Sequence, residues 1–217
     1  MGKVESGLVD MAEASGRRAY HHGDLRQALI DAALTIAEQR GLDQVTVREA
    51  GQRAGVSSGA PFRHFPTKIA LMTAVAEEAM RRFRGEIATA MAEAEGSDPL
   101  DRFRALGTAY LRWVIRNPTH FEVISTRRAI DFDASETLVS LNEEIRTMMV
   151  VLLEEARAAG QLRAVDLDTV PLQARALVYG LARMWIDGQF AQWGGQAQAE
   201  ALMQQSLDSF LALLAKD

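Results

Sequence analysis

The chain of 217 residues contains no cysteine. It therefore has no disulfide framework and no thiolate metal site, which agrees with a reducing, cytoplasmic environment. Long apolar runs are also missing. The longest cover a handful of residues, as in MMVVLL at 148–153, whereas a membrane helix needs about 20. The first residues lack a basic start followed by an apolar stretch, so we expect no signal peptide.

The sequence also lacks the short motifs of the common enzyme and cofactor classes. It contains no P-loop, no Rossmann glycine set, no HExxH and no Glu-x-x-His pair for a di-iron bundle. One G-x-S-x-G match, at 55–59, would need a preceding strand, but the residues before it have a helical pattern. His21 and His22 are adjacent and so cannot share one helical face for a metal. We expect no catalytic residues, no metal and no cofactor.

Positive charge is scarce overall but locally concentrated. The formal net charge is −5. Residues 1–16 hold one Lys or Arg against three acids, residues 17–70 hold eight against five, and residues 71–217 hold fifteen against twenty-one. Only the segment 17–70 is therefore cationic, as a local contact with nucleic acid requires.

That cationic segment contains the most informative stretch, TVREAGQRAGVSSGAPFRHFPTK at 46–68. Thr46 and Glu49 fit the capping box of a first short helix. Gly55 fits its end, because the turn needs a residue without a Cβ. Two helices joined by a glycine-containing turn of three or four residues are typical of a helix-turn-helix. This motif places its second helix, here about 58–64, in the DNA major groove.

The second helix has few apolar side chains that could be buried in a core, and its aromatic side chains are those of Phe62 and Phe65. Its hydroxyls, its arginine and its small first residues suit a close approach to base edges and phosphates. If Ser58 is the N-cap, Pro61 falls in the first turn, where its missing N–H costs nothing. If Ser57 were the cap, the ring of Pro61 would clash with the carbonyl of Ser57. We therefore expect Ser58 as the cap, or a distorted first turn.

Together with YHHGDLRQALIDAALTIAEQRG before it, the stretch from 46 to 72 resembles the DNA-binding domain of the tetracycline-repressor (TetR) family of transcriptional regulators. The start, the turn and the ending agree in order and spacing over about 20–72. The resemblance implies a first helix that supports the helix-turn-helix. It also implies a C-terminal helical domain that dimerises and binds a small-molecule effector.

Carried over by position, the resemblance assigns two sets of DNA contacts. Family members often have tyrosine at position 62, where this chain has phenylalanine and so lacks a hydroxyl. The phosphate-contacting set is Thr46, Ser57, Phe62, His64 and Lys68, and the base-facing set is Ser58, Ala60 and Arg63. Arg17 and Arg18 come just before this domain. They are either a basic arm for an adjacent minor groove or two solvated side chains.

The periodicity along the chain predicts an all-α fold of about nine helices, because no convincing strand appears. We expect a disordered tail at 1–16, a three-helix DNA-binding domain at 17–70 and a helical bundle at 71–217. Residues that fit helix starts in order are Asp24, Thr67, Asp98, Asn117 and Asp133. The last two helices, about 169–192 and 196–215, have more apolar surface than they can bury alone. They predict a homodimer formed through a four-helix bundle.

An effector cavity follows mainly from the resemblance, and aromatic and methionine side chains between helices suit an apolar ligand. At helical spacing such residues are also ordinary core. The penultimate helix resembles a subfamily with a Trp, His, Gly pattern, but this chain has Arg175, Tyr179 and Gly180 there, so only the glycine is kept. The cavity candidates are Tyr110, Trp113, Phe121, Met148, Met149 and Trp185.

Two functions remain open at this point. The first is a ligand-responsive transcriptional regulator, expected to act as a repressor, whose homodimer binds a palindromic operator in double-stranded DNA and is released by a small molecule. The second is a helical small-molecule-binding or scaffolding protein whose helix-turn-helix contacts a protein partner. Specific DNA affinity that falls steeply with salt would distinguish the first from the second.

Overall fold

The computed structural model describes residues 22–216, and side chains from Leu25 onward. The prediction of a tail at 1–16 and the residues Arg17, Arg18 and His21 lie outside this range. The described part is all-α, as predicted, and contains no extended strand. Its nine helices are α1 His22–Arg40, α2 Val47–Arg53, α3 Ala60–His64, α4 Lys68–Glu93, α5 Pro99–Arg116, α6 Pro118–Ser125, α7 Glu136–Ala158, α8 Val170–Ile186 and α9 Ala199–Leu214.

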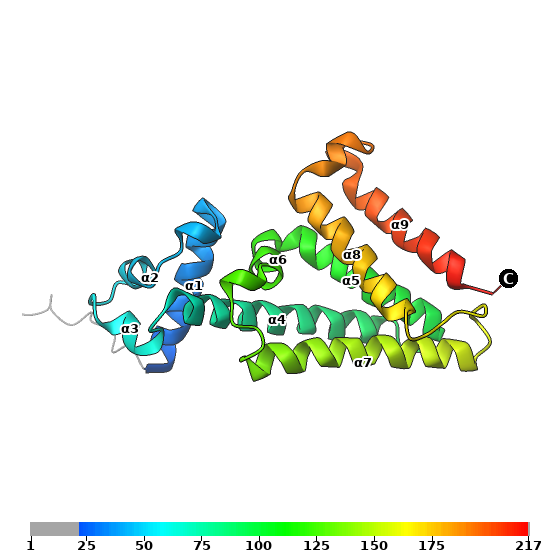
Figure 1. Cartoon of the computed structure of the whole chain (residues 1–217), viewed down its shortest axis with the longest axis horizontal. Helices are drawn as coiled ribbons and strands as arrows, with labels where there is room; N and C mark the ends of the chain where they lie inside the picture. Colours follow the sequence, from blue (N-terminus) through cyan, green and yellow to red (C-terminus); the bar gives the residue numbers. More distant parts are fainter. Residues whose placement is uncertain (1–21, 217) are drawn as a thin grey trace, which may run out of the picture.

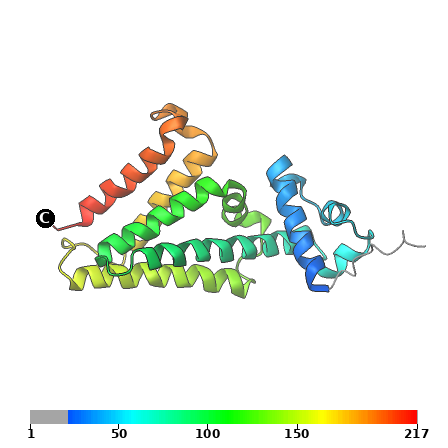
Figure 2. The same ribbon diagram turned by 180° about the vertical axis from the view of Figure 1, so that it is seen from behind.

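The helices form a small head and a larger body (Figure 1). Helices α1, α2 and α3 lie at one end of the molecule, and α4 starts beside them and runs along the body. Helix α7 lies alongside α4, and α5 packs between α4 and the pair α8 and α9, as the view from behind also shows (Figure 2). The long helix α4 is therefore the direct covalent link between head and body. None of the helices in residues 22–216 combines the length and the apolar content that a membrane crossing requires.

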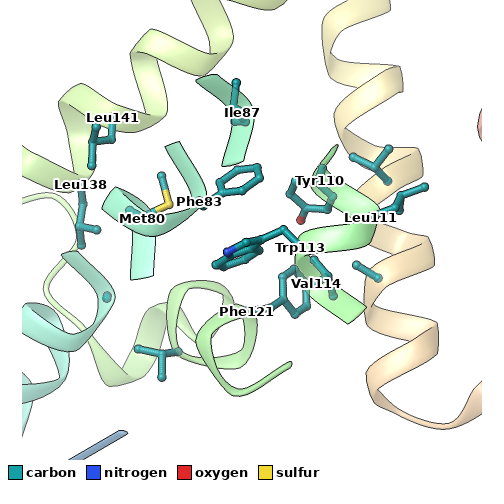
Figure 3. Close-up of a cluster of buried hydrophobic side chains, with 14 of the residues drawn as sticks. Met80, Phe83, Ile87, Tyr110, Leu111, Trp113, Val114, Phe121, Leu138 and Leu141 are labelled. Atoms are coloured by element: carbon teal, nitrogen blue, oxygen red, sulfur yellow. The ribbon is translucent and has the colours of Figure 1, made fainter. Parts of the chain in front are cut away.

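The buried side of α4 organises the core of the body (Figure 3). Phe83 is buried there, with its ring centroid 4.8 Å from that of Trp113 and 5.4 Å from that of Tyr110. The ring of Phe121 on α6 completes the group, 6.3 Å from Tyr110. Burying each such side chain contributes about 1.5–3 kcal/mol. The large apolar side chains at helical spacing along α4 are all buried: Leu71, Met72, Val75, Met80, Phe83 and Ile87.

Several predicted helix starts are confirmed and two are wrong. Thr67 caps α4, since its hydroxyl accepts a hydrogen bond from the N–H of Ala70 at 3.0 Å, and Asp98 and Asn117 occupy the N-cap positions of α5 and α6. Asp24 lies inside α1, which begins two residues earlier. Asp133 lies in a turn closed by Ser135 N–H and the carbonyl of Phe132. Helix α7 therefore starts later, with Ser135 as its cap.

The last two helices are shorter than predicted. Gly188 adopts a positive φ of 69° just after α8, and a 3-10 turn, Gln189–Gln192, replaces the expected helical end. A second 3-10 turn, Gln196–Gln198, precedes α9. The segment after α7 is bound to the end of α9, because the N–H of Arg163 donates a hydrogen bond to the carbonyl of Leu214 at 2.9 Å. Both α8 and α9 pack against α5.

Candidate functional sites: the helix-turn-helix and the cavity

The first half of the helix-turn-helix has the predicted cap at Thr46 and the predicted end at Gly55, but only one half of the predicted capping box. The hydroxyl of Thr46 accepts a hydrogen bond from the N–H of Glu49 at 3.1 Å and so caps α2. The carboxylate of Glu49 pairs with Arg40 on α1 instead of reaching back to residue 46. Gly55 ends α2 with a φ of 71°, a conformation that only glycine adopts readily. The turn between α2 and α3 is therefore set by local sequence.

The second helix of the motif, α3, which we call the reading helix, begins two residues later than predicted. Gly59 occupies its N-cap without a side-chain hydrogen bond, so the predicted cap at Ser58 is wrong. The N–H of Ala60 donates instead to the carbonyl of Ser57 at 3.1 Å, which makes residues 58 and 59 part of the turn. Pro61 does lie in the first turn, as predicted, and it is buried.

The contact that holds α3 against α2 was missed from the sequence. A Cβ added to Gly51 would lie 2.2 Å from Cγ of Pro61, so no other residue leaves room for the ring at this spacing. Gly51 is buried in the middle of α2. A glycine inside a helix lowers its stability and therefore has a packing reason.

Buried and exposed residues alternate on α3 in a way that presents one side outward. Pro61 and Phe65 are buried against the head, while Phe62 is 42% exposed and Arg63 is exposed. Of the predicted DNA contacts, Thr46, Ser57, Ser58, Phe62 and Arg63 are exposed, and Ala60, His64 and Lys68 are half-buried.

Lys68 already has partners within the head. Its Nζ donates to the carbonyl of Leu42 at 2.9 Å and to that of Asp43 at 2.8 Å. One of its three N–H groups is therefore left for another acceptor. Arg48 and Arg53, at the two ends of α2, are exposed and make no ion pair in residues 22–216. With Arg63 they form an exposed set of free cations on the head that the sequence patterns had not singled out.

A cavity of about 750 Å³ lies in the body, between helices α4 to α8 and the segment 125–132. Its wall contains Tyr110, Phe121 and Met149 from the predicted set, together with Met80 and Phe83. Trp113, Met148 and Trp185 do not line it. Trp113 is buried behind Phe83, and Met148 and Trp185 pack half-buried against the core.

The wall of this cavity is more polar than an ordinary core. It includes Arg127, Arg146, Arg157 and Arg175, against the acids Glu154 and Asp168. Tyr110 is the one buried residue of the described chain whose side-chain oxygen has no hydrogen-bond partner. Burial raises the pKa of its hydroxyl to about 12, and the nearby charge of Arg175 opposes that rise. The arginines were not selected from the sequence, although Arg175 stands out in the apolar helix α8.

An exposed reading helix on a cationic head, joined by one long helix to a body with a cavity, defines a ligand-responsive DNA-binding protein. The model of the family described as "Bacterial regulatory proteins, tetR family" matches residues 29–75. That described as "Tetracyclin repressor-like, C-terminal domain" matches residues 103–210. The chain belongs to the TetR family of transcriptional regulators. It is a regulator and not an enzyme, and residues 55–59 follow helix α2 rather than the strand that a nucleophile elbow needs.

Similar proteins include transcriptional repressors of Mycolicibacterium and Rhodococcus. The chain is 28% identical over 188 residues to the repressor KstR2 of Mycolicibacterium smegmatis, covering 84% of this chain and 86% of that one. KstR2 of Rhodococcus jostii is 26% identical over 95% of both chains. A solved structure of a protein of unknown function from Rhodococcus sp. RHA1 superposes with a TM-score of 0.74 at 28% identity, covering 92% of this chain and all of that one. The ketosteroid transcriptional regulator KstR2 of Mycobacterium tuberculosis shares the fold, with a TM-score of 0.65 at 22% identity over 88% and 95% of the two chains.

Proposed function

We propose that this protein is a ligand-responsive transcriptional repressor whose homodimer binds a palindromic operator. The observation that carries the proposal is the outward side of α3. Phe62 and Arg63 are exposed there, while Pro61 and Phe65 fix the helix to the head. A short helix held in this way can enter the major groove as a rigid unit. The head, about 17–70, would read DNA, and the body, about 71–217, would dimerise and sense the ligand.

The proposed contacts divide by chemistry. Arg63 reads base edges, because a guanidinium can donate two parallel hydrogen bonds to guanine. Thr46, Ser57, His64 and the free N–H of Lys68 position the head on phosphates, with Ser58 and Ala60 close to the bases. Phe62, without a hydroxyl, contributes apolar contact. Arg17 and Arg18 would add an arm in the adjacent minor groove.

Dimerisation is proposed through α8 and α9, about 169–215. Each of these helices exposes a large apolar side chain: Leu172 and Leu213 are each 70% exposed. Burying both pairs in a four-helix bundle across a twofold axis would remove this surface from water. The dimer would then set the spacing of two operator half-sites. An effector in the cavity would favour a different spacing and so release the DNA. A regulator of the chromosome works in the cytoplasm.

Selection of bound sequences from a random pool of duplex DNA tests the proposal. We expect the full-length protein to enrich a palindrome with half-sites about one helical turn apart. Its affinity for that sequence should fall steeply as salt rises, because phosphate contacts release counterions. Weak association without sequence preference would instead favour a module that binds a protein partner.

A substitution in α3 sharpens this test. Arg63→Ala should weaken operator binding by about 1–3 kcal/mol and relax the choice of base at one position per half-site. Arg116→Ala is the matched control, since Arg116 is exposed and makes no ion pair in residues 22–216 but lies on the body. If the Arg63 variant enriches the same operator as the wild type with the same affinity, Arg63 does not read bases.

A further inference from the structure

Of the four cavity arginines only Arg146 has a carboxylate partner within residues 22–216, and two of the other three, Arg127 and Arg175, lie over aromatic rings. Arg127 comes just after α6, and its Cζ lies 3.2 Å from the centroid of the Phe132 ring. Arg175 lies on α8, with Cζ 5.1 Å from the ring centroid of Tyr110 and 5.9 Å from that of Tyr179. Within residues 22–216 neither guanidinium makes an ion pair, and Arg175 lies close enough to the hydroxyl of Tyr110 to oppose the rise of its pKa. Both groups lie over aromatic rings in cation–π contacts. Because such a contact does not pair the N–H donors with acceptor atoms, these donors stay available to a ligand.

The acids of the region do not satisfy these two cations. Glu154 and Asp168 line the same cavity but form no ion pair with Arg127 or Arg175 in the described chain. Arg146, by contrast, is already bound to Glu143 at 2.6 Å. The two unpaired charges also act on each other. The pKa of Arg127 is lowered, chiefly by partial burial; the charge of Asp133 opposes this decrease, and the charge of Arg175 adds a smaller decrease. A bound anion would relieve this repulsion.

A third donor without an acceptor belongs to the same cavity. The hydroxyl of Tyr110 is buried and has no hydrogen-bond partner, and Arg175 stacks on the ring that carries it. Leaving such a group unsatisfied is costly, so a native structure that retains it has a reason. Figure 3 shows Tyr110 facing Phe83 and Phe121, which belong to the apolar part of the wall. Free donors and apolar surface therefore adjoin in one cavity.

We infer that the cavity binds an amphipathic organic anion, whose carboxylate or phosphate is held by Arg127 and Arg175 and whose apolar body lies against α4 and α7. The hydroxyl of Tyr110 donates the remaining hydrogen bond to the anion or to a polar atom beside it. A volume of about 750 Å³ suits a ligand of drug or lipid size. The inference rests on the proposed function, in which this cavity receives the effector. It also refines the sequence-based expectation of an apolar ligand.

Calorimetric titration of the full-length protein with matched probes tests the inference. Dodecanoate and dodecanol share a chain and differ in charge, and dodecanoyl-coenzyme A adds phosphates to the same chain. We expect at least one of the two anions to bind about tenfold or more tightly than dodecanol, because charge-assisted hydrogen bonds to arginine are strong. A preference for dodecanoate identifies a carboxylate site, and a preference for the thioester identifies a phosphate site.

Variants assign the preference to the two arginines. In Arg127→Gln/Arg175→Gln the advantage of the anion over dodecanol should fall to about twofold or less, with dodecanol binding unchanged. Arg128→Gln is the control, since Arg128 is exposed in the same segment but does not line the cavity, and it should keep the full preference. If the double variant unfolds, the single variants decide, each losing part of the preference.

Three results would overturn the inference: equal binding of anions and alcohol, no binding of either anion, or a preference that survives in the double variant. None of these touches the proposed function if the protein still binds a selected operator and an uncharged compound releases it. Conversely, a protein that binds the anion but no specific DNA sequence would keep the inference about the cavity and refute the repressor. The two failures are therefore distinguishable.

Discussion

Ser135 donates a hydrogen bond to Glu77, with 2.8 Å between its Oγ and Oε1 of the carboxylate. Ser135 caps α7 and ends the segment that lines the cavity through Arg127, Ile130 and Phe132. Glu77 lies on α4, and its other oxygen, Oε2, is 3.8 Å from Nη2 of Arg26 on α1. One carboxylate therefore joins the cavity wall to the head.

The connection continues to the reading helix. The guanidinium of Arg26 lies 5.4 Å from the ring centroid of Phe65, the buried residue that ends α3. A second hydrogen bond joins the segment 125–132 to α4, since the N–H of Asp131 donates to Oγ1 of Thr73 at 2.9 Å. A ligand that repositions Arg127 or its segment would therefore act on α4 and α1 close to α3. Contact alone does not establish coupling, so it has to be measured.

Glu77→Gln should weaken this coupling while leaving both binding sites intact. The amide still accepts the hydrogen bond from Ser135 but no longer attracts Arg26 by charge. We expect the loss of operator affinity on adding the ligand to shrink by about threefold, in the range of about 0.5–2 kcal/mol for residues that modulate coupling. Ligand affinity and operator affinity measured separately should change by about twofold or less. Glu86→Gln, exposed on the same helix, is the control. An unchanged ligand effect would remove Glu77 from the signal.

Gly51→Ala should displace the reading helix. Its new Cβ would lie 2.2 Å from Cγ of the buried Pro61, so α3 has to move away from α2. We expect operator affinity to fall by about tenfold or more and stability by about 1–3 kcal/mol, as in other overpacked sites. Gly85→Ala is the control: nothing lies within 4 Å of the added Cβ in the middle of α4, so stability should rise by about 0.5–1 kcal/mol. Wild-type operator binding in the Gly51 variant would show that α3 tolerates the shift.

Local sequence determined most of the fold that could be predicted. Gly55, with a positive φ, ends α2 where the pattern indicated, and Gly160 adopts the same conformation just after α7. The caps Thr46 and Thr67 are equally local, because their partners lie three residues away. The predicted caps Asp24 and Asp133 failed for a different reason. Capping patterns recur by chance, and the neighbouring turn or the packing of the helix decides between candidates.

The cavity was harder to predict than the helix-turn-helix, because its residues come from five helices and two connecting segments. Helical spacing showed that Tyr110, Trp113 and Phe121 are apolar-facing, but all three are equally buried, and only the tertiary arrangement separates wall from core. Whether Arg127 and Arg175 form ion pairs likewise depends on which acids the tertiary structure places beside them. Sequence alone supplied the expectation of a cavity, and the structure supplied its polar chemistry.

Lys68→Ala should show two separate effects. Its Nζ holds the carbonyls of Leu42 and Asp43 in the connection between α1 and α2, so its loss should lower the free energy of unfolding by about 1–3 kcal/mol. If the remaining N–H reaches a phosphate, the slope of log affinity against log salt should also become shallower by about one. Urea unfolding measures the first effect and a salt titration on operator DNA the second. A destabilised variant with the wild-type slope would make Lys68 a purely structural residue.

The buried hydroxyl of Tyr110 predicts a specific alkaline behaviour. Its pKa is raised to about 12 in the folded protein, whereas a tyrosine in the unfolded chain ionises near 10. Between these values the unfolded chain releases a proton that the folded chain retains, so stability falls as pH rises through this window. The loss amounts to at most about 3 kcal/mol, and below about pH 10 the group contributes no pH dependence.

Tyr110→Phe removes this pH dependence of stability. Lysine and the other tyrosines titrate alike in both proteins, so their contribution cancels when the variant is compared with the wild type. Urea unfolding at several pH values should show a variant at least as stable as wild type near neutral pH, because no hydrogen bond is lost. Its relative stability should then increase from about pH 10 upward. Parallel curves for the two proteins would mean that the hydroxyl reaches water in solution. In that case the donor would not be available, unsatisfied, for a ligand in the cavity.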